Sequence, residues 1–402
     1  MNGMQCQLKP RATQATAGND WSAVFVHAGA GYHSVPNEPA HREACASACR
    51  AAMAFLKNGG SATDGVEMAL KSLEDNEITN SGYGSNLTID GTVECDASIM
   101  EDSGRSGAVG AVWAFKNPSA LARLLLDNTR QPLSLKRVPP ILLVGHGALD
   151  YAKEHLFPEV DNEALITSHT HARWSRWRRE LDIAEQEEQA ADRCQRVCRL
   201  PTSAAKAAVE KVAANAPRQP DREDLVTDTV GCICVDRWGN VAAGSSSGGI
   251  GMKHRGRIGP AALIGVGTWI ACEGQSVVAA TCSGTGEQMA HTLIASKTVS
   301  RMIATEDEIE ALKKSIEEDF MGSRIVKEST MSSAVGIMAV KIDKASPRAR
   351  IKFLYGHTTD SMVMAHMTPF MKDPETIMSR NRKNPETCLG GKSIQASKLG
   401  AE

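Results

Sequence analysis

The hydrophobic and polar positions of this chain follow two periods, one typical of amphipathic helices and one typical of short strands. Helical periodicity predicts helices at 43–56, 61–74, 118–126, 148–155, 179–198, 286–302 and 306–319. Short apolar runs predict strands at 23–27, 93–100, 108–115, 141–144, 230–235, 241–246, 334–342, 350–355 and 362–367. Because helices are followed by successive strands twice along the chain, we expect an α+β fold rather than a parallel doubly wound one.

Local signals support several of these boundaries. Ser61 with Asp64 has the spacing of a capping box at the start of a helix, and Pro118 suits a first helical turn. The polar run 236–240 separates two apolar strands, so we expect a hairpin there.

The middle of the chain has a different character. Residues 173–179 are basic with two Trp, residues 179–198 are highly charged, and residues 201–224 carry Pro among polar side chains. This pattern predicts a mobile, partly helical segment over about 171–228, a place where proteolysis and function occur. We expect one composite catalytic domain built from 23–228 and 229–402, after a disordered N-terminus at 1–22.

Composition excludes several classes of protein. A formal net charge of −2 provides no basic field to attract nucleic acid, and 42% apolar residues allow a sizeable core. No apolar run reaches the ~18 residues that span a bilayer, and the first twenty residues lack a signal-peptide hydrophobic region. The eleven Cys are scattered and odd in number, which indicates reduced thiols in a cytosolic or nuclear protein.

The cysteines do not form a zinc pattern. The pairs Cys45/Cys49 and Cys194/Cys198 lie four residues apart on expected helices, and no second pair stands near either. We therefore interpret the cysteines, including Cys232 in a strand, as buried small hydrophobic residues.

The bond between Asp228 and Thr229 lies where the polar segment ends and an apolar strand begins. A Thr hydroxyl has no base of its own while the chain is intact. If the chain is cut before Thr229, the new α-amine lies on the same residue as Oγ1. That amine titrates near ~8 and can act as a general base at neutral pH, so one cleavage would create a nucleophile.

Three Gly-rich polar runs after Thr229 could complete such a site. They lie at 245–249, 253–259 and 281–287. Their hydroxyls can bond the nucleophile, their glycines admit backbone N–H groups to an oxyanion, and Arg257 between two glycines can bind a carboxylate. Alone, each run is more typical of an ordinary loop or a solvated basic turn. A phosphate-binding nest is disfavoured at 284–287 because no Gly-Lys-Ser/Thr follows.

Taken together and in order, the motifs resemble the type-2 asparaginase family of N-terminal-nucleophile hydrolases. The second half carries Thr229–Gly231, Asn240–Ala243, Ser246–Gly249, Gly256–Gly259 and Ser283–Glu287. The first half carries Val26–Gly31, Ala62–Asp64, Leu73–Asp75, Asn80–Leu87, Glu94–Met100 and Gly107–Ala111. The resemblance covers roughly 23–170 and 227–367. Two segments, His27–Ser34 and Phe353–Met362, are most similar to the threonine aspartase branch, whose members are endopeptidases.

The resemblance implies a four-layer αββα sandwich and a precursor that cleaves itself between Asp228 and Thr229. The two resulting chains would stay associated as an αβ heterodimer that pairs into (αβ)2. Thr229 would be nucleophile and, through its amine, general base. Ser247 would hydrogen-bond the amine or hydroxyl, Arg257 would bind a substrate carboxylate, and Ser283 with Gly284 would form the oxyanion hole. No cofactor and no catalytic metal are expected.

The branch also implies a protein-processing role. Its substrates would be nuclear regulatory proteins, such as a trithorax-type methyltransferase and a general transcription factor precursor, in the nucleus and cytoplasm. The basic run 173–179 would assist nuclear import. No nucleic acid or membrane partner is expected.

One departure from the family pattern bears on the substrate. Asparaginases of this class have an Asp three residues after the substrate-binding Arg, and it pairs with the free α-ammonium of the substrate. Here that position is Pro260. Losing that carboxylate should cost about 1.5–3 kcal/mol or more. The chain is therefore expected to cut after an internal Asp, whose side-chain carboxylate Arg257 would hold.

Two other functions remain alternatives. One is an L-asparaginase or isoaspartyl peptidase, which Pro260 disfavours. The other is an unprocessed scaffold, which the intact set of candidate residues disfavours. Other residues invite functional interpretations that we do not favour: His27 and His357 as bases, Glu74 and Ser81 at a backbone-bound sodium ion, and Trp174 and Trp177 as nucleic-acid stacking groups. We expect the two Trp to pack inward with the neighbouring Arg outward.

Overall fold

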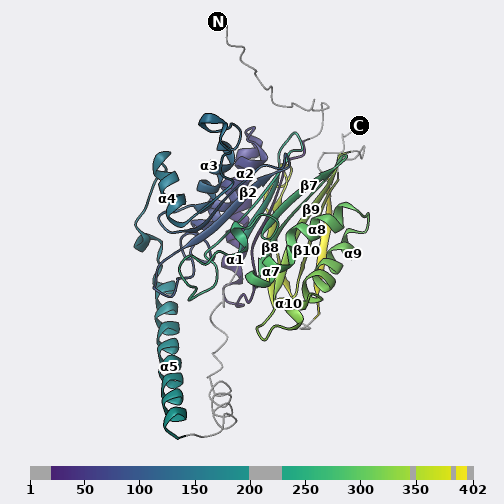
Figure 1. Cartoon of the computed structure of the whole chain (residues 1–402). Coiled ribbons are helices and arrows are strands. Elements are labelled where there is room, and N and C mark those ends of the chain that lie inside the picture. The colour runs from purple at the N-terminus through teal and green to yellow at the C-terminus, as the bar shows by residue number, and fades with distance from the viewer. Residues whose placement is uncertain (1–19, 199–228, 345–349, 382–385, 396–402) are drawn as a thin grey trace, which may run out of the picture.

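The protein is built from two β-sheets with helices packed on them (Figure 1). The computed structural model describes residues 20–198, 229–344, 350–381 and 386–395. The eight strands of the larger sheet are, in spatial order, β12 (Glu375–Arg380), β11 (Ser361–Met367), β1 (Ala23–Gly31), β5 (Val230–Val235), β6 (Val241–Ser247), β2 (Cys95–Glu101), β3 (Ser106–Val112) and β4 (Leu142–Val144). The five strands of the smaller sheet are β13 (Cys388–Gln395), β10 (Arg350–His357), β9 (Val335–Asp343), β8 (Ser276–Gly284) and β7 (Thr268–Glu273).

The helices cover both sheets and connect them. They are α1 (Glu38–Lys57), α2 (Ala62–Glu74), α3 (Pro118–Asn128), α4 (Gly145–Glu154), α5 (Ser168–Cys198), α7 (Gly286–Thr292), α8 (Ile294–Ile303), α9 (Glu308–Lys314) and α10 (Arg324–Lys327). Short 3₁₀ turns lie at η1 (Ser134–Lys136), η2 (Asn162–Leu165) and η3 (Pro260–Ala262), and η4 (Ser315–Met321) is π-helical. This mixture of helices and mainly antiparallel strands agrees with the predicted α+β fold.

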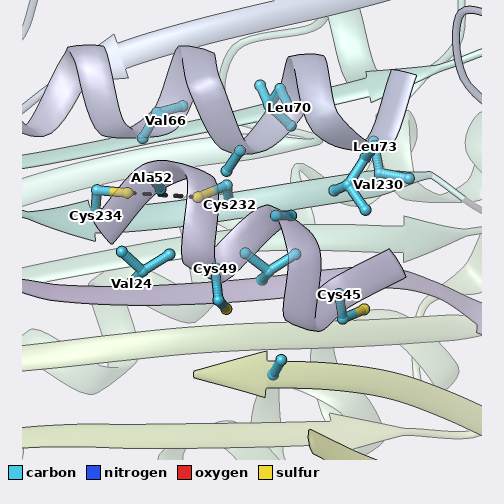
Figure 2. Close-up of a cluster of buried hydrophobic side chains, with 14 of the residues drawn as sticks. Val24, Cys45, Cys49, Ala52, Val66, Leu70, Leu73, Val230, Cys232 and Cys234 are labelled. Atoms are coloured by element: carbon cyan, nitrogen blue, oxygen red, sulfur yellow. Dashed lines mark hydrogen bonds between the residues drawn. The ribbon is translucent and has the colours of Figure 1, made fainter. Parts of the chain in front are cut away.

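The pairing of α2 with the larger sheet shows how the sequence sets the packing. Ser61 and Asp64 form the predicted capping box, which satisfies two backbone N–H groups at the helix start. Val66, Leu70 and Leu73 follow at helical spacing and lie over the strand that begins at Val230 (Figure 2). Burying each of these side chains contributes on the order of 1.5–3 kcal/mol. This core fixes the strand on which the candidate nucleophile stands.

Two of the other cores involve the smaller sheet. One lies between the sheets and combines residues of β1 and β5 with residues of β9 and β10, including a stacked pair, Phe25 and Phe353, with ring centroids 5.2 Å apart. The other lies between the smaller sheet and helices α8 and α9. Within the described ranges, no helix combines the length and the apolar character that crossing a membrane requires.

The cysteines resolved in side-chain detail carry free thiols. Cys45, Cys49, Cys232, Cys234 and Cys282 are buried, which confirms the interpretation of these positions as small hydrophobic residues. Burial raises the pKa of the Cys45 thiol to about 12, so it stays protonated and unreactive at neutral pH.

The hairpin predicted at 230–246 is present. β5 and β6 pair antiparallel from Val235 opposite Val241 to Val230 opposite Ser246. The Asp236 carboxylate organises the turn by accepting hydrogen bonds from the backbone nitrogens of Trp238 and Asn240. The turn chemistry read from the sequence therefore sets the register of the two strands nearest the candidate site.

Several elements differ from the sequence prediction. The helix predicted over 286–302 is broken at Leu293, which adopts the left-handed conformation with φ of 51° and separates α7 from α8. Strands β7, β8, β12 and β13 were not predicted. Ser283, assigned to a loop, lies inside β8, where the antiparallel pairing with β9 extends as far as Gly284.

Helix α5 begins earlier than predicted and projects from the body (Figure 1). Trp174 donates to the Thr88 carbonyl at 3.0 Å, and Trp177 lies against Gly251, so both Trp pack inward as expected. The expectation that the neighbouring Arg face outward is wrong for Arg173. It is buried, donates to Asn86 and lies over the Trp177 ring, because the helix docks along the edge that carries both groups.

Candidate active site

Thr229 lies at the start of β5, where the two sheets approach each other. It is 4% exposed, and its backbone nitrogen donates to Ser283 Oγ at 3.2 Å. The same hydroxyl oxygen accepts from the backbone nitrogen of Ala30 at 3.3 Å. Ser283 therefore joins β8 of the smaller sheet to β5 and β1 of the larger one. Asp228, the other half of the predicted cleavage bond, lies outside the described residues.

Ser247 stands beside Thr229 on the neighbouring strand. Since Val230 pairs with Ser246, continuing the register by one residue places Ser247 opposite Thr229. Ser247 is buried, and its Oγ accepts from the backbone nitrogen of Gly249 at 2.9 Å. This hydroxyl thus shapes the loop after β6, and its direct bond to the amine or hydroxyl of Thr229 remains a prediction.

Gly284 ends β8 next to Ser283 in a conformation that requires glycine. Its φ is 147°, and a Cβ built there would overlap the carbonyl oxygen of Ala334. The two residues predicted to form the oxyanion hole are therefore the last two of β8, and Ser283 contacts Thr229. Their role as an oxyanion hole remains a prediction.

Arg257 lies in a slot lined by glycines. A Cβ at Gly259 would approach its Nη1 to 2.7 Å, and one at Gly286 would approach its Nη2 to 2.6 Å, so larger residues would displace the guanidinium. Because Gly286 follows Gly284 by two residues, the slot brings Arg257 to the turn that directly follows Ser283 and Gly284 at the end of β8. The structure thus gathers Thr229, Ser283, Gly284 and Arg257 at one place, with Ser247 beside them.

Three charged residues at this site were not singled out from the sequence. Glu287 accepts two hydrogen bonds from Arg257, from Nε and from Nη2, both at 2.9 Å. Asp96 is buried and accepts from the backbone nitrogens of Ala111 at 2.8 Å and Gly259 at 2.7 Å. Lys253 is buried and donates to the carbonyl of Glu94 at 2.6 Å. Asp96 and Glu287 fall inside motifs that carry the family resemblance, and Lys253 begins the Gly-rich run 253–259; these were the available signals.

The two carboxyl groups support Arg257 and its loop. Burial raises the pKa of the Asp96 carboxyl, while Lys253, the two backbone bonds and Arg257 act in the opposite direction. The ion pair with Arg257 lowers the pKa of Glu287. The loop that carries Arg257 is therefore anchored at Gly259 by a buried carboxyl group, which fixes the backbone next to Arg257.

Pro260 lies directly beside the Arg257 guanidinium. A Cβ built on Gly286 would meet both Arg257 Nη2 and the ring carbons of Pro260, so the guanidinium and the ring border the same space. Pro260 is buried and is the first residue of η3. The position that could carry a carboxylate for a substrate ammonium is thus an apolar ring. Of the nearby described carboxylates, Glu287 is paired with Arg257 and Asp96 is bonded to two backbone nitrogens.

The two histidines considered as bases are buried in different settings. Burial lowers the pKa of His27 to about 3, with the Thr229 backbone acting in the opposite direction, so its imidazole is neutral at physiological pH. Its Nε2 lies where a Cβ of Gly231 would stand, two residues after Thr229. His357 bonds Thr359 and Ser379 away from this site.

Glu74 and Ser81 lie on the face of β6 that points away from the smaller sheet. The Glu74 carboxylate accepts from the backbone nitrogen of Ser119 at 2.9 Å and from its hydroxyl at 2.8 Å. Ser81 Oγ and Ser246 Oγ are 2.6 Å apart. Among the described residues, no group of three or more His, Cys, Asp or Glu could hold a metal ion.

The fully buried Glu74 predicts a pH dependence of stability. Burial raises its pKa from 4.5 to about 7, against hydrogen bonds from Ser246 and Ser119. Since the folded pKa exceeds the unfolded one, this group's contribution is fully present below pH 4.5 and is lost as pH rises through 7. We expect Glu74→Gln to gain up to about 3 kcal/mol of unfolding free energy over the native chain between pH 5 and pH 8.

Urea unfolding of both proteins at the two pH values measures this difference. Glu77→Gln, which changes an exposed carboxylate three residues away, is the matched control and should show no such gain. An equal stability difference between Glu74→Gln and the native chain at both pH values would contradict the prediction.

Comparison with known proteins gives the context of this site. A family model described as asparaginase matches residues 21–341. A plant-type L-asparaginase of Pyrococcus abyssi is 33% identical over 310 residues, which are 75% of this chain and 88% of that protein. A probable isoaspartyl peptidase/L-asparaginase 2 of Arabidopsis thaliana is 34% identical over 64% of this chain and 77% of the Arabidopsis protein. An isoaspartyl peptidase/L-asparaginase of Mus musculus is 34% identical over 66% of this chain and 68% of the mouse protein.

Proposed function

The chain belongs to the asparaginase family of N-terminal-nucleophile hydrolases, and from this premise we propose that it cleaves an amide bond of an aspartyl group with Thr229 as nucleophile. Thr229 becomes N-terminal when the chain cleaves itself at Asp228. Its nitrogen then becomes the general base for Oγ1. The bond of 3.2 Å from that nitrogen to Ser283 Oγ supports this proposal, because it fixes the nitrogen in place.

The other roles follow from position. Arg257 binds the carboxylate of the aspartyl group, and Ser283 with Gly284 stabilises the oxyanion of the tetrahedral intermediate. Ser247 orients the Thr229 amine or hydroxyl. The products of self-cleavage are an α chain that ends at Asp228 and contains the region 23–228, and a β chain, 229–402. They form one catalytic unit with the four-layer αββα arrangement and pair into (αβ)2.

Within this family we propose the finer activity of a threonine aspartase, an endopeptidase that cuts after an internal Asp. The observation that carries it is Pro260 beside Arg257. A free amino-acid substrate brings an ammonium that needs a carboxylate there, whereas an internal Asp has its amine acylated and needs none. Arg257 then holds the Asp side chain, and attack falls on the main-chain carbonyl. The Asp228–Thr229 bond presents the same Asp-X chemistry.

The competing candidate is L-asparaginase or isoaspartyl peptidase activity. The names of the relatives support this activity better than they support an endopeptidase. All of the candidate catalytic residues are compatible with it, and Pro260 alone disfavours it. Both activities would use the same nucleophile, so the experiment that separates them compares which substrates are hydrolysed.

The experiment compares one peptide with an internal Asp against L-asparagine and a β-aspartyl dipeptide. We expect the processed chain to cut the peptide after Asp and to hydrolyse the other two slowly. Pro260→Asp should raise β-aspartyl hydrolysis about tenfold or more, because it restores an ammonium partner worth about 1.5–3 kcal/mol. Efficient hydrolysis of L-asparagine by the native chain, with no peptide cleavage, would establish the competing candidate.

We also propose nuclear regulatory proteins as substrates, among them a trithorax-type methyltransferase and a general transcription factor precursor, with action in nucleus and cytoplasm. Support for this part comes from the resemblance of His27–Ser34 and Phe353–Met362 to the threonine aspartase branch. Its direct test is cleavage of such a protein at an internal Asp.

A further inference from the structure

Arg257 uses only one side of its guanidinium group within the described protein. The pair Nε and Nη2 binds both carboxylate oxygens of Glu287, at 2.9 Å each. Nη1 has no hydrogen-bond partner among the described residues, and it lies between the positions of Gly249 and Gly259. Gly249 is bonded through its nitrogen to Ser247. The unused edge of the fork therefore faces the loop after β6, which the candidate catalytic hydroxyl of Ser247 holds through Gly249.

Glu287 is placed to hold the fork from the opposite side. It stands in the first turn of α7, three residues after Gly284, and its side chain is 55% exposed while that of Arg257 is 14% exposed. An Arg side chain has several rotatable bonds, so binding a carboxylate bidentately costs conformational entropy unless another group fixes the fork. Gly259 and Gly286 leave room for the guanidinium but do not orient it. Among the described residues, Glu287 is the only one that forms an ion pair with Arg257 within 4.0 Å, while Asp96 acts on Arg257 from a greater distance.

We propose that Glu287 is the positioning residue that orients Arg257 and thereby sets the site's selectivity for a substrate carboxylate. This inference rests on the proposed role of Arg257. With Nε and Nη2 occupied, Nη1 and the free side of Nη2 point at the substrate, where they form the charge-assisted bonds that a neutral amide cannot match. Glu287 touches no reacting atom and acts through Arg257.

If the Glu287 carboxylate had a different role, its removal would change substrate binding in the opposite direction. A carboxylate in the Arg257 fork could compete with a substrate carboxylate for it, and removing the competitor would tighten binding. Geometry favours positioning because the edge bound by Glu287 differs from the edge that faces Gly249. Measuring the direction of the change in KM therefore decides between them.

The test measures kcat and KM for Glu287→Ala, Glu287→Gln and Glu287→Asp in the processed protein. We expect Glu287→Ala to raise KM for the internal-Asp peptide about tenfold while kcat changes about twofold or less, since one oriented charge-assisted contact is weakened. Discrimination between Asp and Asn peptides should fall in parallel. Glu287→Asp, which keeps the carboxylate, should recover part of the loss, and Glu287→Gln should recover less.

Glu328→Gln is the matched control. Glu328 lines the same pocket of about 600 Å³ as Glu287 but pairs with Arg324, so its neutralisation should leave KM unchanged. The β-aspartyl dipeptide is assayed in parallel, because it also presents a carboxylate to Arg257. If only the dipeptide is hydrolysed, the endopeptidase proposal fails. The role of Glu287 is then tested by the change in KM for the dipeptide.

Succinate binding by calorimetry provides a readout that does not depend on turnover. We expect Glu287→Ala to weaken it about tenfold. A lower KM or tighter succinate binding in Glu287→Ala would show that Glu287 competes with the substrate. Unchanged KM and unchanged succinate binding would show that the ion pair is a surface contact without a role. Either result overturns the inference.

Discussion

Thr229→Ala is expected to abolish both cleavage of the chain and hydrolysis of every substrate. The variant lacks the hydroxyl that we propose attacks the Asp228 carbonyl, so the protein should stay a single band of 43.0 kDa in denaturing electrophoresis. Turnover should fall at least about a thousandfold, because no neighbouring hydroxyl carries an α-amine on the same residue. Mass analysis of the fragments and a peptide assay measure the two effects.

Thr229→Ser separates the chemistry from the packing at this position. It keeps the hydroxyl and removes one methyl group from a residue that is 4% exposed, so cleavage should persist at a lower rate. Cleavage at Asp228 that continued in Thr229→Ala would overturn the nucleophile assignment. A protein that remained one chain in its native form yet hydrolysed substrate would overturn the proposed activation step.

Gly284→Ala is expected to have the second largest effect. A Cβ there overlaps the Ala334 carbonyl oxygen, and φ of 147° is strained for any residue with a side chain. Strain and overpacking together should cost about 3 kcal/mol of unfolding free energy and displace Ser283 from Thr229. Unfolding midpoints measure the first effect, and loss of self-cleavage reports the second.

Gly274→Ala is the matched control, since it lies in the turn of the β7–β8 hairpin that ends at Gly284. Its φ is 58°, and a Cβ added there meets nothing within 4 Å, so only the backbone conformation resists the change. It should cost about 1 kcal/mol and leave cleavage intact. Equal effects of the two substitutions would show that contact with Ala334 is unimportant.

The sequence predicted the fold class and the hairpin at the nucleophile because those features depend on local patterns. The capping box at Ser61 and the turn at Asp236 each involve residues within five positions of one another. The order of the Gly-rich motifs also indicated which residues gather around Thr229, and the structure places Ser283 in contact with it. Local chemistry and motif order were sufficient for this much.

Other features depend on distant contacts that no local pattern shows. Arg257 and Glu287 are thirty residues apart, and their pairing follows from how η3 and α7 meet. Leu293 takes the left-handed conformation inside a run with good helical periodicity, because α7 and α8 must turn around the sheet end. The hairpin turn at Gly274 was a readable signal for β7 and β8, but the polar residues at 281–287 suggested a loop where a strand continues.

The strand order of the larger sheet has a consequence for the two products that the proposed cleavage before Thr229 would give. β1, which precedes that residue in the chain, lies between β11 and β5, which follow it, and β2 pairs with β6 in the same way. Each product alone would expose strand edges that only the other product pairs, and such edges promote aggregation. The two products would therefore alternate within the larger sheet, and each would need the other to keep its strand edges paired.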